Sequence, residues 1–228
     1  QQANAHTEKI SKEQRKRMKT VLVFGATGTT GQQIVRECLK AGHSVSAVSR
    51  RAVYPFTHPH LNVHVAESLD AASVQAALPG HEVVVSAVGN RDYNDPKMVV
   101  FPLAQHIFAG LGATSPARVI VIGGMGLLQY NATTMYKDLS SGSGGVAYPR
   151  ADHFAAYQFV REQPNAWTFV CPPQIVEGDA DGNYAVAGDY FPAGVRAIIS
   201  AGNIGHFVAQ EIDQAAFINK RVGIGTRA

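Results

Sequence analysis

The chain has 228 residues, of which 46% are hydrophobic and 16% are charged, and this composition is typical of an ordinary globular protein. No apolar run approaches the roughly 20 residues that cross a bilayer, so we expect no membrane-spanning segment. The net charge of +3 comes from the first 20 residues, which carry +4, while the remainder sums to −1. We therefore expect a basic extension over residues 1–19 that is solvated rather than bound to nucleic acid or an anionic surface.

Residues 20–228 are long enough for one substantial core, and we expect a single domain. The two cysteines, Cys38 and Cys171, lie far apart inside apolar segments. Their number and spacing predict neither a disulfide framework nor a metal site. We expect a cytoplasmic protein. Because the sequence begins at Gln1, an exported form whose signal has been removed is the alternative, and Met18 could equally be a native start.

From Thr20 onward, short β-branched runs alternate with amphipathic stretches. In chain order, this pattern predicts a strand at 21–25, a helix at 31–41, strands at 44–49 and 62–66, a helix at 71–78, a strand at 82–88, a loop at 89–97, a helix at 99–110, a strand at 118–122, a helix at 151–162 and a strand at 168–171. We interpret residues 140–145 as a Ser/Gly loop, and we expect residues 181–191 and 203–219 to form a small cap and a last helix. Such alternation predicts an α/β, Rossmann-type, doubly wound parallel sheet with right-handed crossovers.

The glycine-rich turn after the first strand carries the strongest chemical signal. It reads Gly25-Ala26-Thr27-Gly28-Thr29-Thr30-Gly31 and leads into a helix. Glycines in this setting allow a tight turn and close approach of the backbone to a pyrophosphate, whose charge is met by the N–H groups of the helix N-terminus. A strand before the turn and a helix after it favour a dinucleotide site over a purely structural turn.

Two arginines, Arg50 and Arg51, follow the second strand about 20 residues after the turn. Sites specific for NAD place an acidic residue there, on the ribose. Arginine instead suits a 2′-phosphate, because its planar fork binds phosphate through two hydrogen bonds. We therefore predict NADP(H) as the cofactor. A solvent-facing role remains open for each arginine, and more so for Arg51.

The chain resembles the atypical short-chain dehydrogenase/reductases, and within them the biliverdin-IXβ reductase/flavin reductase family. The resemblance spans about residues 20–219 and rests on the glycine turn together with Asp152-His153, Cys171-Pro172-Pro173-Gln174-Ile175, Gly182-Asn183-Tyr184 and Gly205-His206-Phe207. It implies a nicotinamide cofactor bound by residues that include Ala87, Val88, Gly89, Gly123, Gly124, Met125, Pro172, Pro173, Gln174 and Ile175. It also implies that His153 lies at the mouth of the nicotinamide pocket, where a neutral-range pKa suits proton delivery. A helix-start histidine capped by Asp152 is the alternative.

The chain departs from that pattern at two points. The catalytic Tyr-x-x-x-Lys spacing occurs only at Tyr93 and Lys97, in a loop broken by Pro96, and we interpret it as coincidence. The flavin reductase family usually has a hydroxyl residue just after the fifth strand, where this chain has Gly124. Hydride transfer to a flavin can still proceed, because the cofactors carry that chemistry once they are stacked.

Other histidines and aromatic residues are weaker candidates. His58, His60 and His64 lack cysteine or carboxylate partners, so we predict no metal. His206 is expected to be a packing residue before the final helix. A stacking surface for a planar substrate is an alternative to ordinary packing for six aromatic residues: Tyr130, Tyr136, Phe154, Tyr184, Tyr190 and Phe191.

The sequence thus predicts an NADPH-dependent reductase that passes hydride to a flavin, a quinone or another planar conjugated acceptor. We predict neither a nucleic-acid nor a membrane partner, and the oligomeric state is open. A sensor that binds NADP(H) without turnover, contacting a partner through residues 140–145 or the basic extension, is the first alternative. An epimerase or isomerase that uses bound NADP is the second, disfavoured by the lack of a placed tyrosine base.

Overall fold

The structure is a computed structural model that describes residues 17–90, 92–139 and 147–228. Most of the basic extension and the loop at 140–145 lie outside these residues. The strands are β1 (Thr20–Phe24), β2 (Ser44–Ser49), β3 (Leu61–Val65), β4 (Val83–Ser86), β5 (Arg118–Ile122), β6 (Trp167–Cys171), β7 (Gln174–Val176), β8 (Tyr184–Gly188), β9 (Val195–Arg196), β10 (Ile198–Ser200) and β11 (Lys220–Arg227). The helices are α2 (Thr29–Lys40), α3 (Ala71–Ala77), α4 (Val100–Leu111), α5 (Ala147–Val160) and α6 (Ala201–Gln214), with 3₁₀ turns η1 (Met125–Leu127) and η2 (Tyr136–Asp138).

One large sheet runs through the molecule in the order β3-β2-β1-β4-β5-β6-β11-β8. In this order, each of the first seven strands, from β3 at the edge to β11, pairs in parallel with its neighbour. Strands β8 and β9 pair antiparallel to β11. Because β1 lies between β2 and β4, the chain reverses its direction of progress across the sheet at this point. The carboxyl ends of the parallel strands share one edge, and such a reversal point is where doubly wound folds bind ligands.

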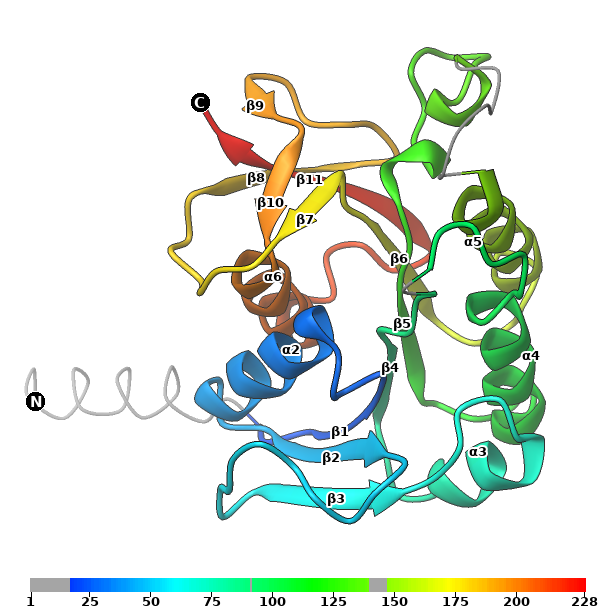
Figure 1. Cartoon of the computed structure of the whole chain (residues 1–228), viewed down its shortest axis with the longest axis vertical. Coiled ribbons are helices and arrows are strands. Elements are labelled where there is room, and N and C mark those ends of the chain that lie inside the picture. The colour runs from blue at the N-terminus through cyan, green and yellow to red at the C-terminus, as the bar shows by residue number, and fades with distance from the viewer. Residues whose placement is uncertain (1–16, 91, 140–146) are drawn as a thin grey trace, which may run out of the picture.

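Helices cover both faces of the sheet. Figure 1 shows α2 and α6 on one side and α3, α4 and α5 on the other. Each layer buries its own apolar cluster, because neighbouring residues of a strand point to opposite faces. Leu22 and Phe24 of β1 pack toward α4, whereas Val21 and Val23 pack toward α2 and α6. Such burial on both faces explains the nearly continuous apolar runs of the central strands.

The packing of α6 on α2 depends on Gly205. A Cβ at this position would lie 2.6 Å from the carbonyl oxygen of Gln33 on α2. The glycine therefore lets the two helix backbones approach closely. His206 lies within α6, which corrects its predicted position before the final helix. Its Nδ1 lies 2.9 Å from the Tyr184 hydroxyl, so the predicted packing role agrees with its contacts.

The predicted Rossmann-type, doubly wound α/β fold is confirmed, with differences at the C-terminal side. The last helix spans Ala201–Gln214 rather than 203–219, and the long strand β11 follows it. Two glycines interrupt the apolar pattern of β11, which concealed it in the sequence. Gly223 is required by tertiary packing, since its Cβ would lie 2.2 Å from the Tyr190 carbonyl oxygen.

Among the described residues, none of the helices combines the length and apolar character needed to traverse a bilayer.

Candidate functional site

The glycine-rich turn is held by close backbone contacts that no side chain could enter. Gly25 has a φ of +73°, and a Cβ there would lie 2.5 Å from the Ala87 carbonyl oxygen. A Cβ at Gly31 would lie 2.0 Å from the Gly25 carbonyl oxygen. Gly28 donates its N–H to the same carbonyl at 3.0 Å and closes the turn. The chain needs glycine at the first and last of these positions to bring α2 against β1 and β4.

Helix α2 presents free N–H groups at the end of this turn. Gly28 is its N-cap and offers no side-chain cap, and the first turn contains no acidic residue. The first intrahelical acceptor, the Gly28 carbonyl, serves Gln32, so the N–H groups of Thr29, Thr30 and Gly31 lie ahead of the helical ladder. Unpaired N–H groups and the positive end of the helix dipole bind an anion such as a pyrophosphate. The cradle therefore fits a dinucleotide.

A cavity of about 270 Å³ opens beside the turn. Its walls combine five segments and include the predicted residues Gly25, Thr27, Gly28, Arg50, Ala87, Val88 and Gly89. The sequence analysis did not identify two further groups of lining residues. They are the segment after β3, which contributes Ala66, Glu67, Ser68 and Leu69, and Val99, which precedes α4. The first of these groups follows a strand end in the same way as Arg50 does, and that signal could have identified it.

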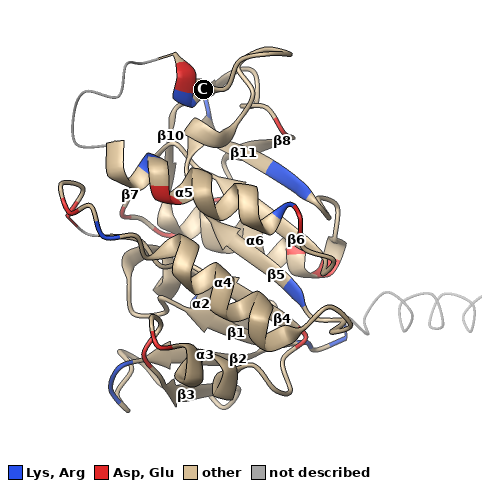
Figure 2. Ribbon diagram, turned by 90° about the vertical axis from the view of Figure 1, so that its right-hand side faces the viewer, with Lys and Arg blue, Asp and Glu red and all other residues tan. Residues whose placement is uncertain are grey.

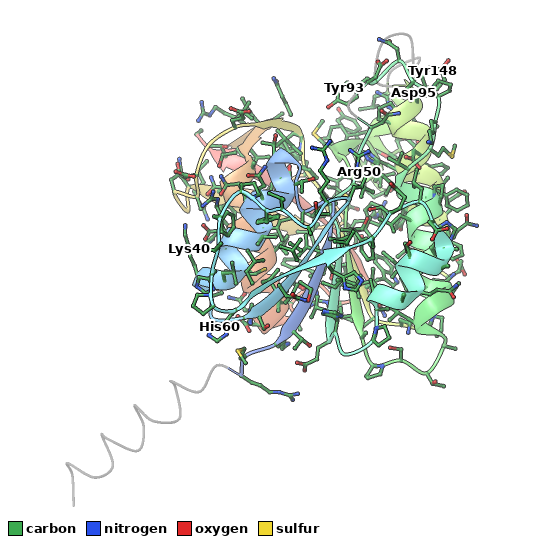
Figure 3. The ribbon with its side chains drawn as sticks, turned by 60° about the horizontal axis from the view of Figure 1, so that its bottom comes forward. Lys40, Arg50, His60, Tyr93, Asp95 and Tyr148 are labelled. Carbon is green, nitrogen blue, oxygen red and sulfur yellow. The ribbon has the colours of Figure 1, made fainter. Side chains whose placement is uncertain are left out.

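The two arginines differ in their position. Arg50 lines the cavity, and Figure 3 labels it in the loop after β2. Arg51 is not among the lining residues, and its backbone N–H donates to the Ser49 hydroxyl at 3.2 Å. Both side chains are exposed. Arg50 is thus the arginine that shares a cavity with the glycine turn.

The end of β5 carries the second part of the site. Gly123 lies against Phe169, whose ring a Cβ would meet at 2.3 Å, and Gly124 faces His153. A Cβ at Gly124 would lie 3.1 Å from Nδ1 of the imidazole. The space that a hydroxyl side chain would need is therefore bordered directly by His153. The backbone N–H of Met125 donates to the Pro172 carbonyl at 2.8 Å, which joins the loops after β5 and β6.

His153 is the polar side chain at this position. The residue is partly buried, and its ring makes no hydrogen bond to another residue in the described part of the chain. Burial by the surrounding protein lowers its pKa below the ordinary value of 6.5, and the charge of the neighbouring Asp152 opposes that effect. The imidazole is therefore neutral near pH 7, with one nitrogen able to donate and one able to accept.

Asp152 does not cap its own helix, and that alternative is wrong. Helix α5 begins at Ala147, so the predicted helix start at 151 was too late and Asp152 lies in the second turn. Its carboxylate instead accepts hydrogen bonds from three N–H groups at the start of α4. This pairing joins residues more than 50 positions apart, which no local pattern reveals.

The segment after β6, residues 172–176, contains the predicted residues Pro172, Pro173, Gln174 and Ile175 and forms a small sheet of its own, here called the roof. Gln174–Val176 pairs in parallel with Ile198–Ser200 in a separate two-stranded sheet. Pro172 is buried, Pro173 is partly buried, and Gln174 and Ile175 are exposed. Buried Asn203 holds the loop beyond the roof, donating to Asp181 Oδ1 at 2.8 Å and accepting the Asp181 and Gly182 N–H groups at 3.1 Å. The Gly182-Asn183-Tyr184 and Gly205-His206-Phe207 motifs meet where the Tyr184 side chain contacts His206 and Phe207.

The six aromatic residues have unequal access to a substrate. Tyr136 makes edge-to-face contacts with Tyr130 and Phe191. Lys137 lies 4.3 Å from the centre of the Phe154 ring, and Tyr184 contacts His206. Tyr130 and Tyr190 are exposed. Tyr93 and Tyr148, which were outside the predicted set, are also exposed and lie at one corner of the molecule, where the loop before α4 passes the start of α5 (Figures 1 and 3).

The weaker candidates remain unsupported as catalytic groups. Tyr93 and Lys97 lie in a loop before α4 rather than on a helix. Within the described ranges there is no cluster of three or more His, Cys, Asp or Glu side chains placed to hold a metal. Burial raises the pKa of the Cys171 thiol to about 12, which leaves it uncharged and unreactive.

Comparison with known proteins agrees with this geometry. A family model described as NAD(P)H-binding matches residues 25–215, from the glycine turn to the end of α6. The chain belongs to the NAD(P)H-binding family. This membership confirms the predicted resemblance to the atypical short-chain dehydrogenase/reductases.

Several solved structures share the fold over nearly the whole chain. A protein from Burkholderia pseudomallei, provisionally named as exported, is 26% identical with a TM-score of 0.76, covering 91% of this chain and 100% of its own. A provisionally named NADH-flavin reductase from Streptococcus pneumoniae is 23% identical with a TM-score of 0.79, covering 92% and 100%. A provisionally named epimerase from Bacteroides thetaiotaomicron is 22% identical with a TM-score of 0.79, covering 93% and 99%.

Proposed function

We propose that this protein is an NADPH-dependent reductase that passes hydride to a flavin or another planar conjugated acceptor. The observation that carries the proposal is the neutral imidazole of His153, which lies against Gly124 at the same sheet edge as the glycine-turn cavity lined by Arg50. Bound NADPH would supply a hydride, and the acceptor would take it up with a proton from solvent or from a donor such as His153.

The cofactor half of the proposal assigns distinct tasks to backbone and side chains. The N–H groups of Thr29, Thr30 and Gly31 bind the pyrophosphate, and Gly25 and Gly28 shape the turn around it. Arg50 binds the 2′-phosphate and selects NADPH over NADH. The loops carrying Gly123 to Met125 and Pro172 to Ile175 frame the nicotinamide end.

The acceptor half rests on shape and polarity. Seven of the ten exposed large hydrophobic residues in the described ranges come from segments that follow β4, β5, β6 and β8: Tyr93, Met98, Tyr130, Leu139, Tyr148, Ile175 and Tyr190. Of these, Tyr93 and Tyr148 lie at one corner of the molecule (Figure 3), and exposed apolar side chains that gather in this way favour an apolar ligand. Gly124 has no side chain of its own, so His153 is the polar side chain that borders this position. The imidazole then orients the acceptor through a hydrogen bond and, because it is neutral, relays a solvent proton by taking one up at one ring nitrogen as it releases one from the other.

The test is the loss of reduced-nicotinamide absorbance when the purified protein is mixed with NADPH or NADH and with FMN, riboflavin or a quinone. We expect acceptor-dependent oxidation that is faster with NADPH than with NADH. Arg50→Ala should reduce that preference, and Arg51→Ala serves as the matched control. Rates equal to those of the same mixtures without protein would overturn the reductase.

A sensor that binds NADP(H) without turnover is the second candidate, and Gly124 favours it because a hydroxyl donor is missing there. Tight NADPH binding, measured by calorimetry, with no oxidation by any acceptor would select the sensor.

A further inference from the structure

Helix α4 lacks an N-terminal cap of its own. Its N-cap, Val99, provides no side-chain hydrogen bond, and its first turn contains no acidic residue. The helix carries no charged residue at all, and Figure 2 shows it without blue or red along its length. Its first N–H groups and the positive end of its dipole therefore need a partner from elsewhere in the chain.

Asp152 of α5 supplies that partner. Oδ2 accepts from the N–H groups of Val99 at 2.8 Å and Val100 at 2.9 Å, and Oδ1 accepts from Phe101 at 2.8 Å. The Asp152 residue is only 4% exposed. Three short bonds to a buried carboxylate fix the start of α4 relative to the second turn of α5.

Both ends of this link reach the candidate site. Val99 lines the cavity beside the glycine turn. His153, the residue after Asp152, lies against Gly124 at the end of β5. One carboxylate therefore joins the wall of the cofactor cavity to the side chain that faces the acceptor.

We propose that Asp152 is a positioning residue that couples occupancy of the cofactor cavity to the placement of His153. The inference rests on the proposed function and extends it to the order of events at the site. A cofactor packed against Val99 restrains the start of α4, and the carboxylate transmits that restraint to α5. The imidazole is then held more firmly for the acceptor when the cavity is filled.

The test compares Asp152→Asn with Asp70→Asn. The asparagine has nearly the same shape as Asp152, yet its NH₂ group replaces one carboxylate oxygen and cannot accept from an N–H, so the three bonds cannot all persist. Asp70 is the matched control because it also caps a helix, accepting from the Ser73 N–H at 2.7 Å at the start of α3. Loss of an aspartate cap is thus common to both variants, whereas the link to His153 is lost in one.

The first readout is the His153 imidazole signal in NMR spectra of histidine-labelled protein, assigned with His153→Gln and followed during addition of oxidised NADP. We expect the signal to move in the parent protein and in Asp70→Asn, and to lose most of that movement in Asp152→Asn at saturating NADP. The second readout is kinetic. We expect Asp152→Asn to lower kcat/KM for the acceptor by about tenfold, as misplacement of a reacting group does, while Asp70→Asn leaves it unchanged.

Asp152→Glu retains the carboxylate and should restore part of the response, and it carries the test if Asp152→Asn does not fold. An equal His153 response in Asp152→Asn and Asp70→Asn would overturn the coupling and leave Asp152 as a helix cap. A His153 signal that does not respond to bound NADP in the parent protein would overturn it as well. If the response is lost in Asp152→Asn but no acceptor is reduced by the parent protein, the coupling stands and the reductase fails.

Discussion

The two halves of the site are built in different ways. The phosphate cradle of the cofactor half is local: one strand, one turn and one helix, Thr20 to Lys40, supply it, and the chain needs glycine at Gly25 and Gly31 because backbone atoms lie where a Cβ would be. The acceptor half is assembled from Gly124, His153 and Pro172, which are remote in sequence. Backbone geometry therefore dominates the first half, and side-chain packing between distant elements dominates the second.

Gly31→Ala should give the largest effect on cofactor binding, because it disturbs the backbone of the glycine turn directly. The new Cβ would lie 2.0 Å from the Gly25 carbonyl oxygen, so the turn must move. We expect NADPH affinity to fall by about 100-fold, measured by calorimetry. Gly126→Ala is the control, since its Cβ would meet its nearest neighbour at 3.6 Å. Equal affinity in the two variants would show that the turn does not hold the cofactor.

Asp152→Asn removes hydrogen bonds between α5 and the start of α4, which connect the two halves of the site. We expect its effect on stability to be the next largest. Loss of charge-assisted bonds to Val99, Val100 and Phe101 should lower the free energy of unfolding by about 2 kcal/mol in denaturant titrations. Asp70→Asn should lower it by less, because Asp70 is exposed and accepts from one residue. An equal loss in both variants would mean that burial of Asp152 adds nothing to its capping role.

Arg50→Gln tests the side chain that the cofactor half uses for selectivity. Loss of a charged hydrogen bond to a 2′-phosphate should lower the NADPH to NADH preference by about tenfold or more. The preference is measured as the ratio of the two dissociation constants. Arg51→Gln should leave that ratio unchanged, and a larger effect at Arg51 would reassign the phosphate contact.

The pH dependence of stability reports on the acceptor half. Burial lowers the His153 pKa in the folded state, so below the ordinary value of 6.5 the unfolded chain binds a proton that the folded site resists. Stability is therefore lost as pH falls below about 6.5. His153→Gln should remove up to about 0.8 kcal/mol of the loss between pH 8 and pH 6, in denaturant titrations. His81→Gln is a useful comparison, because burial also lowers the His81 pKa. An unchanged pH dependence in His153→Gln would show that the imidazole titrates normally.

Gly124→Ala should have the smallest effect and the most local one. Its Cβ, 3.1 Å from Nδ1 of His153, would displace the ring by a few tenths of an ångström. We expect acceptor turnover to fall by about threefold with NADPH affinity unchanged. Steady-state kinetics with the best acceptor measures this. A parallel loss of NADPH affinity would place Gly124 in the cofactor half instead.

The sequence by itself determined the α/β alternation, the glycine turn and the family, because each depends on residues that are close along the chain. Strand and helix periodicity are local properties, and Gly25 to Gly31 carries its chemistry in the backbone. It also placed Arg50 after the second strand, where parallel topology brings the strand ends together.

Tertiary structure alone decided the rest. Strand β11 could not be recognised in the sequence, because Gly223 interrupts its apolar pattern. The glycine is required there by the nearby backbone of Tyr190, which is a tertiary contact. The cavity wall at Val99, the approach of His153 to Gly124 and the capping of α4 by Asp152 all join segments far apart in sequence. Hydrogen bonding and close packing between such segments depend on how the helices lie on the sheet, and no local periodicity encodes that arrangement.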